Sequence, residues 1–230
     1  MMIARRHGAL ISAALLTLGF VPIARGDIIL YDNTANPTPD TVLFSVGPYT
    51  AIGDQLHLVS AGTANQAAVE FYNNGGAGTF DAELDFFAVG SPVGTELGSF
   101  FYPTAISSTG GDVLDLTFNL AGGLTVSQDV IFLVSISNVN SNDPGNPMDL
   151  GLDMYEAPTV GTSDNTFMVV ASAGPVYSQI GTNMENVYFQ LSGTPTLTTT
   201  PEASSLTLLG TGLLLLGFGA RVQKQPLPRK

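Results

Sequence analysis

The stretch Phe80-Asp81-Ala82-Glu83-Leu84-Asp85-Phe86 decides the fold class of this chain. Its apolar residues alternate one by one with the carboxylates Asp81, Glu83 and Asp85. Because successive side chains of a β-strand point to opposite faces, this pattern predicts a strand with one buried and one solvated face. The same two-residue period recurs in Val113–Asn119, which predicts a second strand of this kind.

Outward from this stretch, the chain repeats short apolar segments separated by Gly, Pro, Asn, Asp and Ser clusters at intervals of roughly ten residues. The expected strands are Ile28–Tyr31, Thr41–Val46, Gln55–Ser60, Ala67–Tyr72, Phe80–Val89, Gly98–Tyr102, Val113–Asn119, Val130–Ser137, Met148–Leu152, Thr166–Ala171 and Asn186–Leu191. Within the domain and up to Ser204, no run of helical period is long enough to compete with this strand pattern. The pattern predicts an all-β domain, a jelly-roll-like antiparallel β-sandwich.

Charge is distributed very unevenly along the sequence. All seven Lys and Arg residues lie in the two end segments, up to Arg25 and from Arg221 onward, while all nineteen carboxylates fall between Asp27 and Glu202. Between these end segments only His57 can gain a positive charge. Such a segment repels phosphate, so nucleic acid is excluded as a partner. Cysteine and tryptophan are both absent, so disulfides cannot stabilise the fold and a sugar platform would use Tyr or Phe.

The N-terminal segment has the pattern of a secretory signal peptide. Arg5 and Arg6 precede the apolar run 9–23, and small residues surround a cleavage position between Gly26 and Asp27. We expect a signal helix over 1–26 and an extracellular β domain over 27–193. An uncleaved N-terminal anchor is the alternative.

The C-terminal segment has the pattern of a membrane anchor. Residues 204–220 carry no charge and are followed by four basic residues, and a helix of this length reaches roughly 26 Å, close to the hydrocarbon thickness. The basic end predicts a cytoplasmic C-terminus. We expect a Thr/Pro linker over 194–200 and a transmembrane helix over about 204–220; a buried helix of a globular domain is the alternative.

The segment 201–230 resembles the PEP-CTERM sorting region of bacteria, with the box Pro201-Glu202-Ala203, a glycine-containing apolar helix and a basic end. The second proline of the family's box is replaced by Ala203. The resemblance implies processing by an exosortase-type enzyme and association with cells that produce exopolysaccharide or form biofilms.

The β domain resembles the uncharacterised bacterial extracellular domains of the choice-of-anchor type. The similarity lies in turns and strand edges, namely Leu30-Tyr31-Asp32-Asn33, Ile52-Gly53-Asp54-Gln55, Tyr72–Asp81 and Val89-Gly90-Ser91-Pro92-Val93-Gly94. It implies a β-rich surface module and brings no catalytic residues.

Two enzyme classes are disfavoured by residue inventory. A Ser-His-Asp triad would need His57, which lies among apolar neighbours in an expected strand, and the sequence contains no Gly-x-Ser-x-Gly elbow. A zinc site needs several His or Cys ligands, which the β domain lacks.

Paired carboxylates on the Phe80–Phe86 strand leave a glycosidase open. Asp81, Glu83 and Asp85 share one strand face at spacings of about 6–7 Å, in the range such mechanisms use. Glu83 and Asp85 also match part of the Glu-x-Asp-x-x-Glu pattern of jelly-roll glucanases, whose last position is Ala88 here. A solvated strand face explains the same residues.

Calcium is the ligand that the loop chemistry favours most. Asn138, Asn140, Asn142, Asn146 and Asp149 supply oxygen side chains at a spacing like that of an EF-hand loop. Asp143 adds a carboxylate within the same segment, so the calcium candidates are Asn138, Asn140, Asn142, Asp143 and Asp149. A plain polar loop is the alternative interpretation. No other cofactor is expected.

Taken together, these patterns predict a cell-envelope protein, exported across the inner membrane and either anchored there or released to the surface after processing. We expect a non-catalytic adhesion or matrix module that contacts exopolysaccharide or other surface proteins, and we expect no nucleic-acid partner. The alternative is a secreted carbohydrate-active hydrolase that uses carboxylates such as Glu83 and Asp85.

Overall fold

The computed structural model describes residues 26–45, 49–90, 93–163, 167–171, 174–178 and 186–196. The chain divides into two compact units, Met1–Thr196 and Leu197–Lys230, and all described residues belong to the first. The expected signal helix, most of the linker and the sorting tail with its helix over 204–220 lie outside the described residues. Within the described part of the chain, no helix is long and apolar enough to cross a bilayer.

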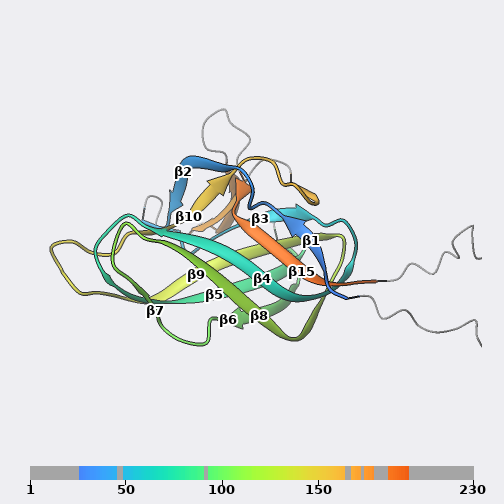
Figure 1. The fold of residues 1–230 in the computed structure, drawn as a ribbon, viewed down its shortest axis with the longest axis horizontal. Helices are drawn as coiled ribbons and strands as arrows, with labels where there is room; N and C mark the ends of the chain where they lie inside the picture. Colours follow the sequence, from blue (N-terminus) through green and yellow to red (C-terminus); the bar gives the residue numbers. More distant parts are fainter. Residues whose placement is uncertain are drawn as a thin grey trace, which may run out of the picture. The chain divides into compact units, whose positions relative to one another are not determined.

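The described chain is all-β, as the sequence predicts (Figure 1). Its strands are β1 Ile28–Asp32, β2 Pro37–Leu43, β3 Ala51–His57, β4 Gly62–Asn73, β5 Gly78–Ala88, β6 Glu96–Phe101, β7 Ile106–Ser108, β8 Val113–Val126, β9 Asp129–Ser141, β10 Leu150–Tyr155, β11 Thr162–Ser163, β12 Phe167–Ala171, β13 Gly174–Ser178, β14 Asn186–Val187 and β15 Phe189–Pro195.

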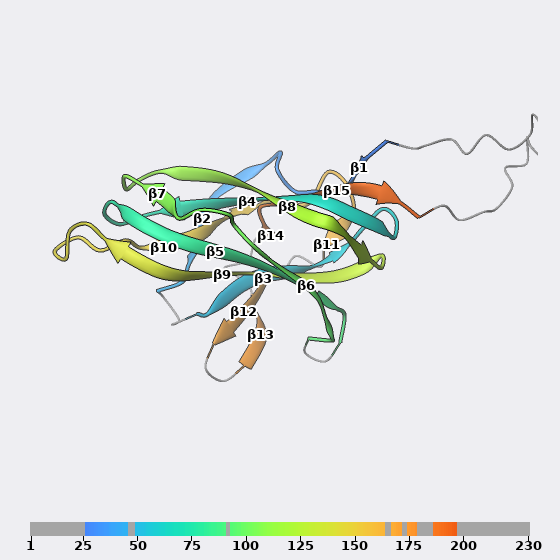
Figure 2. The same ribbon diagram turned by 90° about the horizontal axis from the view of Figure 1, so that it is seen from below.

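The strands form two antiparallel sheets, which Figure 2 shows as separate layers. The first sheet has the order β1-β15-β4-β10-β14, with β8 on the other edge of β4 and β2 on β10. The second has the order β13-β12-β3-β9-β5-β6, with β7 also on β5 and β11 also on β3. Two antiparallel sheets with a shared core agree with the predicted β-sandwich.

Four of the strand pairs are nested along the sequence. The chain pairs β5 with β6, β4 with β8, β3 with β9 and β1 with β15. The two sheets therefore consist largely of one long antiparallel ribbon, to which β10, β12, β13 and the short strands are added.

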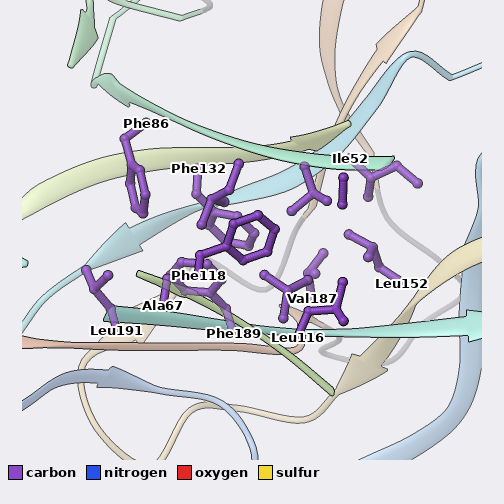
Figure 3. Close-up of a cluster of buried hydrophobic side chains, with 14 of the residues drawn as sticks. Ile52, Ala67, Phe86, Leu116, Phe118, Phe132, Leu152, Val187, Phe189 and Leu191 are labelled. Atoms are coloured by element: carbon purple, nitrogen blue, oxygen red, sulfur yellow. The ribbon is translucent and has the colours of Figure 1, made fainter. Parts of the chain in front are cut away.

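The core lies between the sheets and is rich in phenylalanine (Figure 3). Phe132 of β9 stacks on Phe189 of β15, with ring centroids 3.8 Å apart and an interplanar angle of 16°. Phe86 packs against Phe189 edge-on at 6.2 Å. Because Phe132 and Phe189 belong to different sheets, this aromatic group joins the two layers.

The alternation predicted for Phe80–Phe86 is confirmed. Phe80, Leu84 and Phe86 are fully buried, whereas the carboxylates between them are partly exposed. Strand β8 alternates in the same way, although it extends to Val126, beyond the expected end at Asn119. Gly122 and Gly123 adopt positive φ within this strand, a conformation that glycine allows. In the sequence the two glycines resemble a turn, so the expected strand ends before them.

Two strand boundaries differ from expectation because proline occupies strand positions. β2 begins at Pro37, and β15 continues to Pro195 through Thr194, two residues into the expected linker. Thr194 pairs with Thr63, and Pro195 pairs with Gly62. Proline is tolerated at strand ends and edges, where its missing N–H costs no ladder hydrogen bond.

Candidate functional site

The residues predicted to bind calcium are divided between a strand and the loop after it. Asn138 and Asn140 lie within β9, Asn142 and Asp143 begin the following loop, and Asp149 immediately precedes β10. The predicted polar loop is therefore shorter than the predicted calcium motif.

Three of these residues hold local structure through their side chains. Asn138 donates through Nδ2 to Asp81 Oδ2 at 2.6 Å. Asp143 Oδ1 accepts from the Gly145 amide at 2.8 Å, and Asp149 Oδ1 accepts from the Ser45 hydroxyl. Among the described residues, no group of three or more His, Cys, Asp or Glu side chains is placed to hold a metal ion.

The predicted carboxylates of β5 lie on the outer face of the second sheet. Glu83 is directly opposite Phe101 of β6, and Asp85 is directly opposite Ser99. The Ser99 hydroxyl donates to Glu83 Oε1. The Phe101 side chain is 68% exposed. We call Asp81, Glu83, Asp85, Ser99 and Phe101 the β5 carboxylate face.

The β5 carboxylate face combines hydrogen-bond acceptors with an exposed ring. Partial burial raises the pKa of Asp85, the hydrogen bond from Ser99 opposes this shift, and the charges of Glu83 and Glu96 add to it. Carboxylates accept hydrogen bonds from hydroxyl groups, and an aromatic ring offers a flat apolar surface. The face is therefore suited to a polar, uncharged ligand with many hydroxyls.

His57 lies at a surface hollow on another part of the second sheet. Its Nδ1 is 2.7 Å from Asp129 Oδ1, and its Nε2 is 3.2 Å from Gln128 Nε2. The hollow has a volume of about 340 Å³ and is lined by Gln55, Leu56, His57, Thr162 and Ser163.

The serine that lines this hollow, Ser163, does not contact the carboxylate of Asp129 and hydrogen-bonds to another one. The Ser163 hydroxyl donates to Asp54 Oδ2 at 3.1 Å, and Asp54 is fully buried. Ser163 is directly opposite Leu56, whose side chain is in the core, whereas Thr162 is opposite the exposed His57. Because alternate strand residues face opposite sides, Ser163 and His57 point away from each other and do not form a triad.

A second group of carboxylates, which no sequence pattern predicts, lies on the outer face of the first sheet. Glu70 of β4 is directly opposite Asp115 of β8. The Tyr155 hydroxyl donates to Glu70 Oε1 at 2.9 Å, and the Thr41 hydroxyl donates to Asp153 Oδ1 at 2.7 Å. We call Glu70, Asp115, Asp153 and Tyr155 the Glu70 cluster.

Burial and like charge govern titration in the Glu70 cluster. The pKa of Glu70 is raised to about 7. Burial is the largest cause, the charges of Asp153 and Asp115 and a hydrogen bond with Asp115 add to the rise, and the hydrogen bond from Tyr155 opposes it. Burial also raises the pKa of Asp153, which the hydrogen bonds from Thr41 and Glu70 counteract. Glu70 therefore exchanges a proton near neutral pH.

Sequence patterns alone did not reveal this cluster because its members come from three strands. Glu70 lies in an expected strand, Ala67–Tyr72, and Asp115 in another, but nothing local indicates that they are opposite each other. One available signal is that Glu70 is the only carboxylate between Asp54 and Asp81, in a segment rich in small and apolar residues.

The residues expected at the signal cleavage position are both described. Gly26 has open space around its Cα. Asp27 Oδ1 accepts hydrogen bonds from Asn65 Nδ2 at 2.9 Å and from Thr194 Oγ1 at 2.8 Å. Asp27 therefore connects the start of β1 to β4 and β15. The sorting residues Pro201, Glu202 and Ala203 lie outside the described residues.

Three comparisons with known proteins gave no match. Neither family models, nor curated proteins, nor solved structures showed a significant similarity to the chain.

Proposed function

We propose that this chain is an exported bacterial cell-surface protein whose β domain is a non-catalytic adhesion or matrix module that binds neutral polysaccharide. The C-terminal segment would keep it in the membrane or pass it to an exosortase-type enzyme for release at the surface. The PEP-CTERM-like segment 201–230 and the signal-like segment 1–26 support this address.

We also infer that the β-sandwich is a jelly roll. The nested pairing of β5 with β6, β4 with β8, β3 with β9 and β1 with β15 supports this, because rolling one antiparallel ribbon produces that pairing. In a jelly roll, each sheet has one face toward the core and one toward solvent. The β5 carboxylate face is the solvent-facing side of the second sheet.

The observation that carries the proposed binding function is the β5 carboxylate face. Phe101 is 68% exposed and lies directly opposite Glu83. The Ser99 hydroxyl hydrogen-bonds to Glu83 and also to Asp85. Sugars present hydroxyl donors around an apolar C–H face, which matches acceptors that flank a ring. The segment from Asp27 to Thr200 contains no Lys or Arg, so acidic polysaccharides would be repelled.

Cosedimentation of the purified full chain with insoluble polysaccharides tests this function. We expect retention on neutral glucan- or chitin-type polymers and no retention on uronate-bearing polymers at low salt. Equal retention on both classes, or on neither, would contradict the proposal.

A second candidate function, a carboxylate-dependent glycoside hydrolase, is favoured by one observation. Partial burial raises the pKa of Asp85 beside Glu83, and a raised pKa is a property of general acids. Incubation of the full chain with the same polymers should then release new reducing ends, and Glu83→Gln should abolish them. Under our proposal, polymer is bound and no reducing ends appear.

A further inference from the structure

The Glu70 cluster lies at a junction of the first sheet. On one edge of β4, Val69 pairs with Phe189 of β15, whereas Phe71 pairs with Leu152 of β10. Glu70 thus falls where the partner strand changes. On the other edge of β4, Glu70 is opposite Asp115 of β8. One side chain therefore faces the place where four strands meet.

The contacts of the cluster join these strands. Tyr155, near the end of β10, donates its hydroxyl to Glu70, which is 9% exposed. The Tyr188 amide, between β14 and β15, donates to the Asp153 carbonyl at 3.0 Å. β10 itself pairs with β4 over only Leu150, Gly151 and Leu152. Side-chain contacts at Glu70 therefore supplement a short ladder.

The charges around Glu70 all have the same sign when ionised. The groups that shift the pKa of Glu70 are Asp115 from β8 and Asp153 and Tyr155 from β10. Asp115 and Asp32 of β1 raise the pKa of the neighbouring Tyr188. Within β4, Tyr72 follows on the same face. Like charges placed opposite each other on neighbouring strands destabilise a sheet. None of these groups is basic, so the repulsion is relieved by a proton on a carboxylate, and Glu70 is the carboxylate whose pKa is raised to about 7.

We propose that the Glu70 cluster is a proton-operated clamp: protonated Glu70 bridges β4 to β8 and β10, and its ionisation loosens this junction. The clamp lies on the first sheet and does not depend on the proposed polysaccharide binding at the β5 carboxylate face.

The direction of the pH effect follows from linkage. Glu70 takes up a proton in the folded chain near pH 7 but only near its lower, ordinary pKa in the unfolded chain. The folded state therefore binds more protons between these two pH values, and stability falls as the pH rises through 7.

The test is thermal unfolding of the full chain between pH 6 and pH 8.5. We expect the melting temperature of the wild type to fall by several degrees over this range, and that of Glu70→Gln to stay nearly constant and exceed the wild type at pH 8.5. Glu156→Gln, which removes an exposed carboxylate just after β10, is the matched control and should keep the wild-type slope. The same slope in Glu70→Gln and the wild type would overturn the clamp.

A second variant keeps the proposal testable if Glu70→Gln fails to fold. Tyr155→Phe removes the hydrogen bond that lowers the pKa of Glu70, so the fall in melting temperature should move to higher pH. Hydrogen exchange locates the effect: protection of the Tyr188 amide should drop about tenfold or more between pH 6 and 8.5, beyond any drop at Phe132 in the core. An unchanged midpoint in Tyr155→Phe, or uniform protection changes, would contradict the clamp.

Discussion

Asn73 holds together three connections at one end of the domain. It is fully buried at the end of β4, and its Nδ2 donates to the Gly76 carbonyl and to the Ser108 hydroxyl, both at 2.8 Å. Its Oδ1 accepts from the amides of Gly75 at 3.0 Å and Asp149 at 3.2 Å. One amide side chain therefore fixes the β4–β5 turn, the end of β7 and the start of β10.

Asn73→Ala is expected to lower the free energy of unfolding by about 2–4 kcal/mol, because it leaves several buried polar groups without partners. Urea denaturation of the full chain measures this change. Asn74→Ala, at the exposed neighbouring position, is the control and should change the free energy by about 0.5 kcal/mol or less. Equal effects of the two substitutions would show that the hydrogen bonds of Asn73 are unimportant.

Phe132 contributes to stability through apolar contact with the opposite sheet. Its ring stacks on Phe189 and is fully buried. Phe132→Ala should cost about 3–5 kcal/mol of stability, since it removes buried area and leaves a cavity. Phe132→Leu retains most of the volume and should cost less. A loss below about 1 kcal/mol for the alanine variant would mean that the two sheets are not joined by this stack.

At the scale of elements, the sequence predicted the positions of strands better than it predicted which strands pair and in what register. The alternation in Phe80–Phe86 determined both the strand and its exposed face, because burial on one side of a strand leaves a two-residue period. The Glu70 cluster left no such period. It depends on the register of β4 with β8 and β10, and register is set by pairing across distant parts of the chain.

The predicted calcium loop illustrates the same difference. Spacing along the sequence brought Asn138 and Asp149 into one motif, but β9 continues through Ser141 and directs Asn138 toward Asp81. Asp143 and Asp149 cap neighbouring loop groups. The spacing of ligands in a motif is informative only where the chain between them is a loop.

We therefore expect calcium to leave the domain's stability unchanged. A ligand that binds only the folded state raises the melting temperature, so millimolar calcium added to the full chain should shift it by less than about 1 °C. Magnesium at equal ionic strength is the control for screening. A rise of several degrees with calcium alone would show a site that these contacts do not reveal.

At the scale of the whole molecule, charge is separated along the chain. The segment between Asp27 and Thr200 holds acidic residues without Lys or Arg, and the basic residues are confined to the end segments. Among the described residues, the contact of His57 Nδ1 with Asp129 Oδ1 at 2.7 Å is the only one that pairs a carboxylate with a side chain able to carry positive charge. Such a domain is kept soluble by its net charge but is destabilised by self-repulsion.

Added salt should therefore stabilise the folded chain. Screening shortens the Debye length from about 30 Å at 0.01 M to about 10 Å at 0.1 M salt, so the melting temperature should rise over this range of sodium chloride. Sodium chloride and potassium chloride should act equally, because the effect is one of ionic strength. A fall in melting temperature with salt would indicate that attraction between opposite charges dominates instead.

The measurement that tests the central claim most directly is the affinity of the full chain and of Phe101→Ala for a neutral polysaccharide. Phe101 is 68% exposed, so its removal should leave the melting temperature unchanged and weaken binding about tenfold. Val113→Ala removes a residue that is 55% exposed on the other sheet, and it should bind like the wild type. Undiminished binding by Phe101→Ala would contradict the assignment of the β5 carboxylate face as the polysaccharide-binding surface.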